Sequence, residues 1–445
     1  MTAGTADARA DELARRANEV LDRNRRGDWT CPAAGIYPHQ WLWDSCFVAI
    51  GLARVDPRRA ASELRALLRG QWTNGMLPHV VFAPGVRDAG SRRLWQSARD
   101  PRAPRTVATS CITQPPLPAL AARHVADALR PDDARAFLAG VVPAIVRYHE
   151  WLYRERDVRG DGFVALLHPW ECGLDTTPSW MTLLARWGGP WYVRATLRLG
   201  LTHVVRFFRT DTRYLPAAQR ARDDDGLRML ALARVAKRHG FDARRIAAAR
   251  DGLLVEDLAF NALLVVANEC LRDLCARLGT PLDGDLARDA TRTDAALEML
   301  WDDTRGRYCS RDALTGELLD AATIAALLPL ACDVPSARVE RLVSLLKAPG
   351  FAPRHPVPSV PTDAPGFDPE RYWQGPTWVN TNWILVRALD RHGEHARARQ
   401  LARQTLDLVA AHGFAEYFSP LTGEGFGAAG FSWTAALVLD LLAVV

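Results

Sequence analysis

Lysine is nearly absent from this chain. Only Lys237 and Lys347 occur among its 56 basic residues, so arginine carries almost all of the positive charge. The formal net charge is nevertheless only +5, because 51 acidic residues are interspersed with the arginines. A nucleic-acid-binding surface requires a segregated basic patch. We therefore expect no nucleic-acid partner and interpret the arginine excess as codon bias of a GC-rich genome.

Metal motifs, export signals and membrane spans are also missing from the sequence. The eight cysteines show neither C-x-x-C nor zinc spacing, which is typical of reduced thiols in a cytosolic protein. The N-terminus has no apolar stretch of a signal peptide, and no run reaches the roughly 18 apolar residues of a membrane span. We expect a cytoplasmic protein, with no membrane contact and with neither metal nor cofactor in its chemistry. A homo-oligomer is left open.

Helical periodicity dominates what is present, and strand signals are few and short. Apolar residues recur at helical spacing in about a dozen segments. These are 11–25, 39–55, 56–70, 114–130, 130–156, 189–208, 223–240, 255–279, 289–303, 336–348, 375–393, 394–413 and 430–445. No fixed-period repeat links them, so a solenoid is not indicated. We predict one all-α domain over 1–445, with helical hairpins closed into an α/α toroid and loop excursions near 83–113 and 160–190.

Four segments combine aromatic residues with carboxylates or amides. They are YPHQWLWDSCF (37–47), HPWECGLDTTPSW (168–180), YWQGPTWVNTNW (372–383) and EYFSPLTGEGFGAAGFSW (416–433). Sugars demand this mixture, because their apolar faces stack on aromatic rings while their hydroxyls need polar partners. Cleavage of a glycosidic bond also requires two carboxylates. The segments therefore predict a concave, aromatic-lined sugar site.

These segments resemble motifs of glycoside hydrolases built on an (α/α)6 barrel. The clan's E-S-G-x-D-N-S-P-x-W is similar to 171–180, and its Y-W-R/Q-G-P-x-W-x-N-x-N motif is similar to 372–382. The base motif E-x-[YF]-x-P-x-T-G matches 416–423, and TSCITQPP (109–116) resembles another element of the short bacterial members. The resemblance covers nearly the whole chain. It points to glycoside hydrolase family 63, in the clan of processing α-glucosidases, trehalases and glycosylglycerate hydrolases.

The resemblance implies that Asp175 is the general acid and Glu416 the general base. Apolar neighbours would raise the pKa of Asp175 and keep it protonated near neutral pH. Glu416 would activate water on the opposite face of the sugar, with inversion at the anomeric carbon and carboxyl groups about 6.5–9.5 Å apart. From the residues alone, Glu171 rivals Asp175 and Glu424 rivals Glu416.

Further residues of the matching motifs are predicted to bind substrate. Asp44 could instead cap a helix, and Asn380 and Asn382 could be structural, whereas Glu256 and Asp257 are better explained as capping acids. The predicted substrate-binding residues are Tyr37, Gln40, Trp41, Trp43, Asp44, Gln114, Trp170, Glu171, Trp180, Arg209, Tyr372, Trp373, Gln374, Gly375, Trp378 and Trp433.

The acceptor side of the site is the least certain part of the pattern. A glycerate carboxylate needs cationic or N–H partners, for which Arg209 and Tyr214 are candidates. The loop 83–105 is basic and contains Trp95 but no tyrosine, unlike the aromatic loop of relatives. Its six arginines could bind another anion or simply be solvated. The stretch GFGAAG (425–430) matches G-x-G-x-x-G, but too few residues follow it for a dinucleotide fold, so we predict a flexible active-site loop.

The sequence thus predicts an inverting α-glycoside hydrolase acting on a small anionic glycoside. The resemblance implies 2-O-α-glucosylglycerate as the first candidate, with mannosylglycerate or another α-glucoside as the alternative. A sugar epimerase or a phosphorolytic enzyme on the same toroid is a further alternative, although no histidine pair flanks the aromatic motifs. A non-catalytic sugar-binding protein would differ from all of these in tolerating loss of Asp175.

Overall fold

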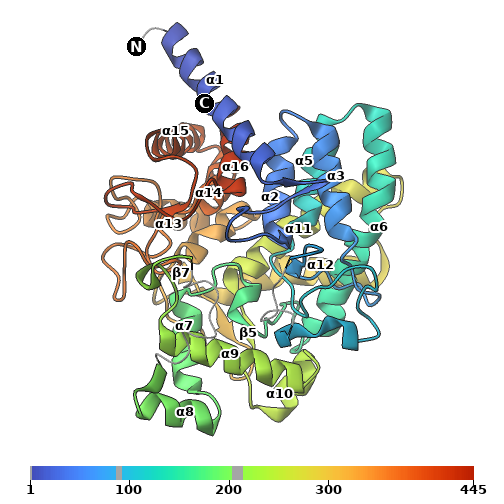
Figure 1. Ribbon diagram of the computed structural model, residues 1–445, viewed down its shortest axis with the longest axis vertical. Coiled ribbons are helices and arrows are strands. Elements are labelled where there is room, and N and C mark those ends of the chain that lie inside the picture. The colour runs from blue at the N-terminus through green and yellow to red at the C-terminus, as the bar shows by residue number, and fades with distance from the viewer. Residues whose placement is uncertain (1–2, 87–92, 203–213) are drawn as a thin grey trace.

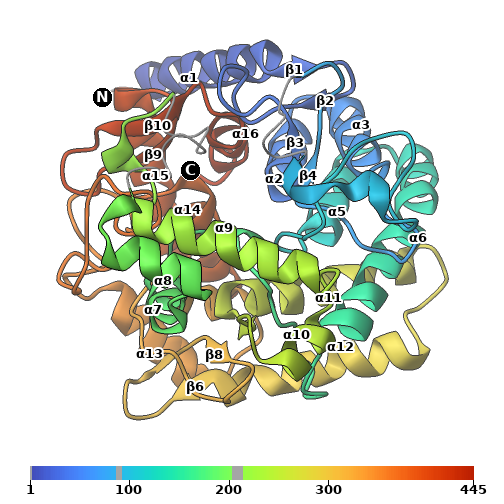
Figure 2. The ribbon, with the colours of Figure 1, turned by 60° about the horizontal axis from the view of Figure 1, so that its bottom comes forward.

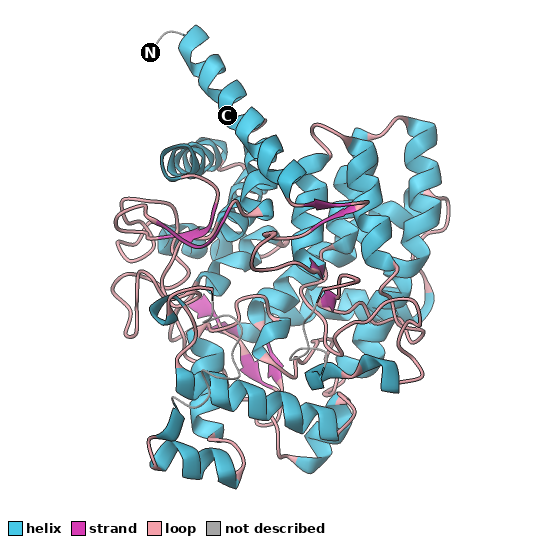
Figure 3. Cartoon of the chain, viewed as in Figure 1, coloured by secondary structure: helices cyan, strands magenta, loops and turns pink. Residues whose placement is uncertain are grey.

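The structure is a computed structural model that describes residues 3–86, 93–202 and 214–445. Helices dominate it, as Figure 3 shows. Within the described ranges, no helix combines the length and apolar character needed to cross a membrane.

The helices of the described chain form two concentric rings. Each inner helix contacts the next, and the last inner helix returns to the first. In order, the inner ring consists of α2 (Leu42–Leu52), α5 (Pro118–Ala128), α11 (Leu258–Arg277), the 3-10 helix η7 (Ile324–Ala331), α14 (Val379–Arg391) and α16 (Ser432–Leu441).

An outer helix packs against each member of the inner ring. In this outer layer, α1 (Ala3–Arg23) packs on α16, α3 (Pro57–Leu68) on α2, and α6 (Pro131–Arg156) on α5. Likewise α12 (Gly284–Ala296) packs on α11, α13 (Ser336–Leu346) on η7, and α15 (His395–His412) on α14. Inner and outer helices alternate along the chain. The predicted (α/α)6 barrel is confirmed (Figures 1 and 2).

Hydrophobic patterning explains which helices lie inside. Every residue of α2 and of α16 is buried, and both helices are apolar on nearly all sides. Outer helices are amphipathic instead, as in α3, where one face is buried and arginines occupy the other. The start of α3 also follows from local sequence: Asp56 caps it by accepting from the Arg59 N–H at 3.0 Å, and Pro57 takes the first helical position.

An insertion separates α6 from α11, and its described residues form four α-helices. It comprises α7 (Pro178–Trp187), α8 (Trp191–Arg198), α9 (Asp223–Arg238) and α10 (Ala243–Ala249). These helices lie at the lower end of Figure 1 and in front of the rings in Figure 2. The prediction for 223–240 holds, whereas α7, α10 and η7 were missed because they are short, and η7 contains Pro329.

Strands are confined to five two-stranded antiparallel ladders in the described chain. They pair β1 (Arg25–Arg26) with β2 (Trp29–Thr30), β3 (Gln40–Trp41) with β4 (Val80–Val81), β5 (Val255–Glu256) with β8 (Arg311–Asp312), β6 (Trp301–Asp302) with β7 (Arg307–Tyr308), and β9 (Ala415–Phe418) with β10 (Gly425–Ala429). Short 3-10 turns complete the connections: η1 (Ser97–Arg99), η2 (Pro169–Glu171), η5 (Ala217–Gln219) and η6 (Leu297–Leu300).

The barrel closes where α16 meets α2, and the two backbones nearly touch there. A Cβ atom on Gly51 would lie 2.0 Å from the carbonyl oxygen of Ala436. Only glycine permits this approach, because the opposing atom belongs to the backbone and cannot rotate away.

Replacing Gly51 with alanine should therefore destabilise the protein, although alanine has the better helix propensity. We expect the free energy of unfolding to fall by about 3 kcal/mol or more, measured by urea denaturation. Gly140, an exposed glycine in the middle of α6 with open space around it, is the matched control. Gly140→Ala should raise the free energy of unfolding by roughly 0.5–1 kcal/mol, and equal effects at the two positions would contradict the closure argument.

Candidate active site

The segments that lead into the inner helices gather the predicted site residues at one end of the barrel. Tyr37 and Trp41 precede α2, and Gln114 precedes α5. Tyr372 precedes α14, and Glu416 precedes α16. The N-termini of these helices carry partial positive charge, which favours the acidic residues placed beside them. Residues far apart in sequence thus gather in one cluster because each stands just before an inner helix.

Glu416 is anchored by three groups. It lies on β9, where its side chain is buried. Its carboxylate accepts from the Tyr37 hydroxyl at 3.1 Å, from Arg220 Nη2 at 3.1 Å and from the Ala428 N–H at 2.9 Å. These bonds fix the orientation of the predicted base. The rival Glu424 is exposed in the turn between β9 and β10, so the structure favours Glu416.

Arg220 is the functional residue that sequence reasoning missed. It follows η5, is buried, and donates to both Glu416 and the Tyr37 hydroxyl. Its guanidinium also lies over the ring of Tyr372, 4.6 Å from the centroid. No aromatic motif surrounds it in AAQRARDDD, so nothing in the local sequence marked it out. The arginine that we predicted, Arg209, lies outside the described residues, and Tyr214 is 65% exposed.

Asp175 lies in the segment between η2 and α7 and keeps partial contact with solvent. Burial raises its pKa from 3.8 to about 8; the nearby Arg220 lowers the pKa, and the negative charge of Glu416 raises it. The segment is held from the other side, because Thr176 accepts from the Trp373 N–H at 3.3 Å and from the Gln374 amide at 3.2 Å. A carboxylic acid that stays protonated at neutral pH can donate a proton to a leaving group.

Asp44 is a third carboxyl group in the same cavity. It is buried in the first turn of α2. Its pKa is raised well above the usual value, first by burial and then by the negative charges of Glu416 and Asp175. Gln114 borders this group, and its side-chain oxygen accepts from the Trp43 N–H at 3.4 Å. Asp44 is therefore part of the site rather than a helix cap.

Four tryptophans of the motifs form a buried cluster. Trp373 and Trp378 stack face to face, with centroids 3.8 Å apart and planes 3° from parallel. Trp43 and Trp433 pack edge to face at 5.3 Å, and Trp433 also contacts Trp378. These four rings are buried, so they set the floor of the site. The partly exposed aromatic residues of the motifs are Tyr37, Trp41, Trp170 and Tyr372.

Glu171 does not face the cavity, and we revise its predicted sugar contact. Its carboxylate is fully buried and forms a two-pronged ion pair with Arg156, with N–O distances of 3.0 and 2.8 Å. The backbone N–H groups of Thr113 and Leu167 donate to the same carboxylate at 3.2 and 2.6 Å. A carboxylate with this many protein donors fixes loops and has little capacity left for a ligand.

Other predicted binding residues are also used within the protein. The Trp180 indole N–H donates to Asp257 at 3.1 Å, and Asp257 caps α11 as predicted. The Gln40 amide donates to Ser45 and Glu63, while Gly375 is fixed by an N–H bond to Ser359 at 3.1 Å. These residues are buried and hold the loops of the site through hydrogen bonds, so we revise their predicted contact with the sugar.

A row of rings borders the other side of the site. Trp41 packs edge to face on His79, His79 on Trp95, and Trp95 on Trp170. Burial lowers the pKa of His79 to about 3, so this ring is neutral. In the described part of the loop 83–105, the arginines are exposed, namely Arg93, Arg99, Arg102 and Arg105. They support the interpretation of a solvated loop.

The GFGAAG stretch is a strand rather than the flexible loop that we predicted. It forms β10, and Gly427 makes room for Glu416, since a Cβ there would lie 2.3 Å from Glu416 Oε2. The glycine thus makes room for the side chain of Glu416.

The fold and the cavity together define a glycoside hydrolase. A model of the mannosylglycerate hydrolase MGH1-like glycoside hydrolase domain matches residues 37–434. The mannosylglycerate hydrolase of Thermus thermophilus is 39% identical over 95% of this chain and 99% of its own length. The glucosylglycerate hydrolase of Mycolicibacterium hassiacum is 35% identical over 97% of this chain and 98% of its own length. This chain belongs to the MGH1-like family, within glycoside hydrolase family 63.

Solved structures agree with this assignment. A mannosylglycerate hydrolase of Thermus thermophilus, in complex with Tris and D-glycerate, superposes with a TM-score of 0.86 at 37% identity, covering 96% of this chain and 99% of that chain. The neutral trehalase of Saccharomyces cerevisiae matches with a TM-score of 0.57 at 13% identity, over 94% of this chain and 73% of that chain, which shows a shared fold.

Gly427 provides a test of the anchoring of Glu416. Gly427→Ala should lower kcat/KM at least about 100-fold, because the added Cβ displaces the base and the backbone there has φ of +71°. Gly279→Ala is the matched control, with φ of +74° and open space around the added atom. Its kcat/KM should stay near that of the wild type, and an equal loss in both variants would attribute the effect to backbone strain alone.

Proposed function

We propose that this protein hydrolyses 2-O-α-glycosides of glycerate with inversion at the anomeric carbon. The observation that carries the proposal is that two unlike carboxyl groups lie close enough for the charge of Glu416 to raise the pKa of Asp175. Asp175 has a raised pKa, whereas Glu416 is held as an acceptor by Arg220, Tyr37 and a backbone N–H. Nearly full-length relatives named mannosylglycerate hydrolase and glucosylglycerate hydrolase support the acceptor.

The proposed reaction assigns one proton to each carboxyl group. Asp175 donates its proton to the glycosidic oxygen as the bond between that oxygen and the anomeric carbon breaks. A water molecule on the opposite face attacks the same carbon and gives its proton to Glu416. Glycerate leaves with the oxygen, and the free sugar has the β configuration. A spacing of about 6.5–9.5 Å between the two carboxyl groups stays a prediction.

The sugar would bind between the aromatic floor and the polar rim. We assign the hydroxyl contacts to Asp44 and Gln114, whose polar groups border the cavity. Trp41 offers an indole N–H that is buried and has no partner in the described chain, so it is available to a sugar hydroxyl or to glycerate. The partly exposed rings of Trp170 and Tyr372 would contact the apolar faces.

Both sugars remain candidates at the cleaved position. The sequence favoured glucose, whereas the identities are 39% to a mannosylglycerate hydrolase and 35% to a glucosylglycerate hydrolase. This difference in identity does not decide between two hexoses that differ only in the configuration of one hydroxyl group. The exposed arginines of the loop 83–105 give no support to the phosphorolytic alternative.

Product analysis tests substrate and stereochemistry together. Purified enzyme is incubated with α-glucosylglycerate and α-mannosylglycerate in parallel, with and without phosphate, and the released sugar is followed by NMR. We expect β-hexose to appear first from at least one substrate, without dependence on phosphate. Initial release of the α-anomer would exclude inversion, and a sugar phosphate would reveal phosphorolysis. Absence of release from both would exclude glycosylglycerates.

The pH profile tests the acid. Asp175 must be protonated to act, and its protonated fraction falls as the pH rises through about 8, so kcat/KM should decline above that pH.

Asp175→Asn should lower kcat roughly 10²–10⁴-fold. Glu416→Gln and Glu424→Gln form a matched pair on one hairpin, of which only the first should be inactive. A full rate in Asp175→Asn would mean that another residue supplies the proton.

A further inference from the structure

Glu63 is a buried carboxyl group that the proposed chemistry does not use. It lies on the outer helix α3, only 1% exposed. Its Oε1 atom accepts from the Ser45 hydroxyl at 2.6 Å and from the Gln40 amide at 3.2 Å. The Gln40 amide is also 3.1 Å from Ser45 Oγ and 3.3 Å from the Glu63 carbonyl oxygen. The three side chains form a closed network, here called the Glu63 bracket.

The Glu63 bracket flanks a run of four residues that includes Trp41 and Asp44. Gln40 and Ser45 stand immediately before and after the run from Trp41 to Asp44. This run contains the start of α2, where Trp41 occupies the N-cap position and makes no side-chain cap. Without a cap, the direction of the first turn depends on tertiary contacts. The bracket supplies some of them from α3, beside the bonds from the Leu42 N–H to the His79 carbonyl oxygen and from the Trp43 N–H to Gln114.

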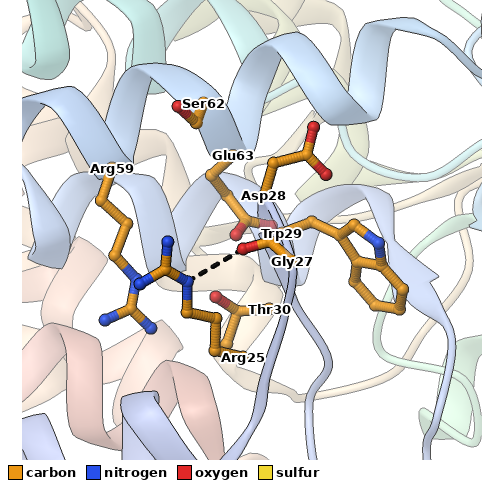
Figure 4. Close-up of a pocket in the computed structure, with 8 residues that line it drawn as sticks. All are labelled: Arg25, Gly27, Asp28, Trp29, Thr30, Arg59, Ser62 and Glu63. Carbon is orange, nitrogen blue, oxygen red and sulfur yellow. Dashed lines mark hydrogen bonds between the residues drawn. The ribbon is translucent and has the colours of Figure 1, made fainter.

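The second oxygen of Glu63 has a different environment. Glu63 Oε2 has no hydrogen-bond partner in the described chain, and neither has Thr30 Oγ1. Both residues line a cavity of about 300 Å³ between α3 and the β1–β2 ladder, with Arg59 and Ser62 at its wall (Figure 4). Burial raises the pKa of Glu63 to about 7, opposed by the hydrogen bond from Ser45. Thr30 and Gln40 oppose this rise as well, so the Thr30 hydroxyl lies near the carboxyl group of Glu63.

The bracket works in either protonation state. Oε1 can accept from Ser45 and Gln40 whether or not Oε2 carries a proton. Removing the side chain, in contrast, would leave the buried Ser45 hydroxyl without its acceptor and would take from the Gln40 amide the acceptor that ties it to the Glu63 side chain. Glu63 and Asp44 are also close enough for the charge of Glu63 to contribute to the raised pKa of Asp44.

We propose that Glu63 is a positioning residue, because it holds Asp44 in the sugar site through Gln40 and Ser45. The inference rests on the proposed function only for its activity readout. It predicts that loss of the bracket displaces Asp44 and lowers the rate, although Glu63 itself never touches the substrate. It also predicts that an uncharged side chain with the same acceptor can replace Glu63.

A double-mutant cycle between Glu63 and Asp44 tests the proposal. Glu63→Ala should lower kcat/KM at least about 30-fold in the wild-type background, but no more than about 3-fold in Asp44→Asn, where the group it positions is already disabled. Equal factors in both backgrounds would overturn the proposal, because Glu63 would then act independently of Asp44.

Two milder variants keep the test valid where Glu63→Ala does not fold. Glu63→Gln retains the acceptor oxygen and should stay within about 3-fold of wild-type kcat/KM. Ser45→Ala removes one donor and should lose about 5-fold, again only when Asp44 is present. Ser62→Ala is the matched control, because its hydroxyl donates to Arg58 O within α3 at 3.1 Å and should not matter. A folded Glu63→Gln with a rate as low as that of Asp44→Asn would contradict the bracket.

A binding measurement separates this inference from the proposed function. If the wild type releases no hexose from either glycosylglycerate, the proposed function fails. D-glucose binding, measured by calorimetry on the same variants, then decides on the bracket. A relative of 36% identity has been solved in complex with glucose, which makes this sugar a suitable probe. Weaker binding in Glu63→Ala that is absent in the Asp44→Asn background would support positioning, and unchanged binding in Glu63→Ala would overturn it.

Discussion

Closure of the helical ring between α2 and α16 is the constraint on which the site depends. The first and last inner helices must meet so closely that only glycine fits at position 51. Their contact brings Asp44, near the start of the chain, beside Glu416, near its end. The other inner helices then place Gln114, Tyr372 and the acid-bearing segment around the same opening. A barrel that failed to close would separate the carboxyl groups and leave no cavity.

Three carboxyl groups lie close together there, and two of them interact with the buried cation Arg220. Arg220 contacts Glu416 directly and influences Asp175, so the two carboxyl groups experience different fields. Asp175 has no direct ion pair among the described residues, and burial is the largest influence on its pKa, which it raises. Asp44 lies among negative neighbours, which raise its pKa further. The different roles that we propose for Asp175 and Glu416 thus follow from the placement of the Arg220 guanidinium group.

The fold could be predicted from the sequence because it leaves local signals, and so do the two carboxyl groups that we propose as acid and base. Helical periodicity marked nearly all barrel helices, and the motifs around Asp175 and Glu416 are contiguous. Arg220 and Glu63 could not be found in the same way, since each meets its partners only after the barrel closes. Arg220 stands 196 residues from Glu416, and Glu63, on α3, stands 23 residues from Gln40 in β3.

The motifs also failed to separate residues that line the cavity from residues that support it. Trp180 and Glu171 have the residue types expected of a sugar site, yet one donates to a helix cap and the other neutralises Arg156. The reason is physical: short loops need buried polar partners to hold a catalytic side chain within a fraction of an ångström. Aromatic rings and carboxylates serve equally well in both layers. Only the three-dimensional arrangement shows that Gln40 faces Glu63, so that one part of a sugar-binding motif positions the rest.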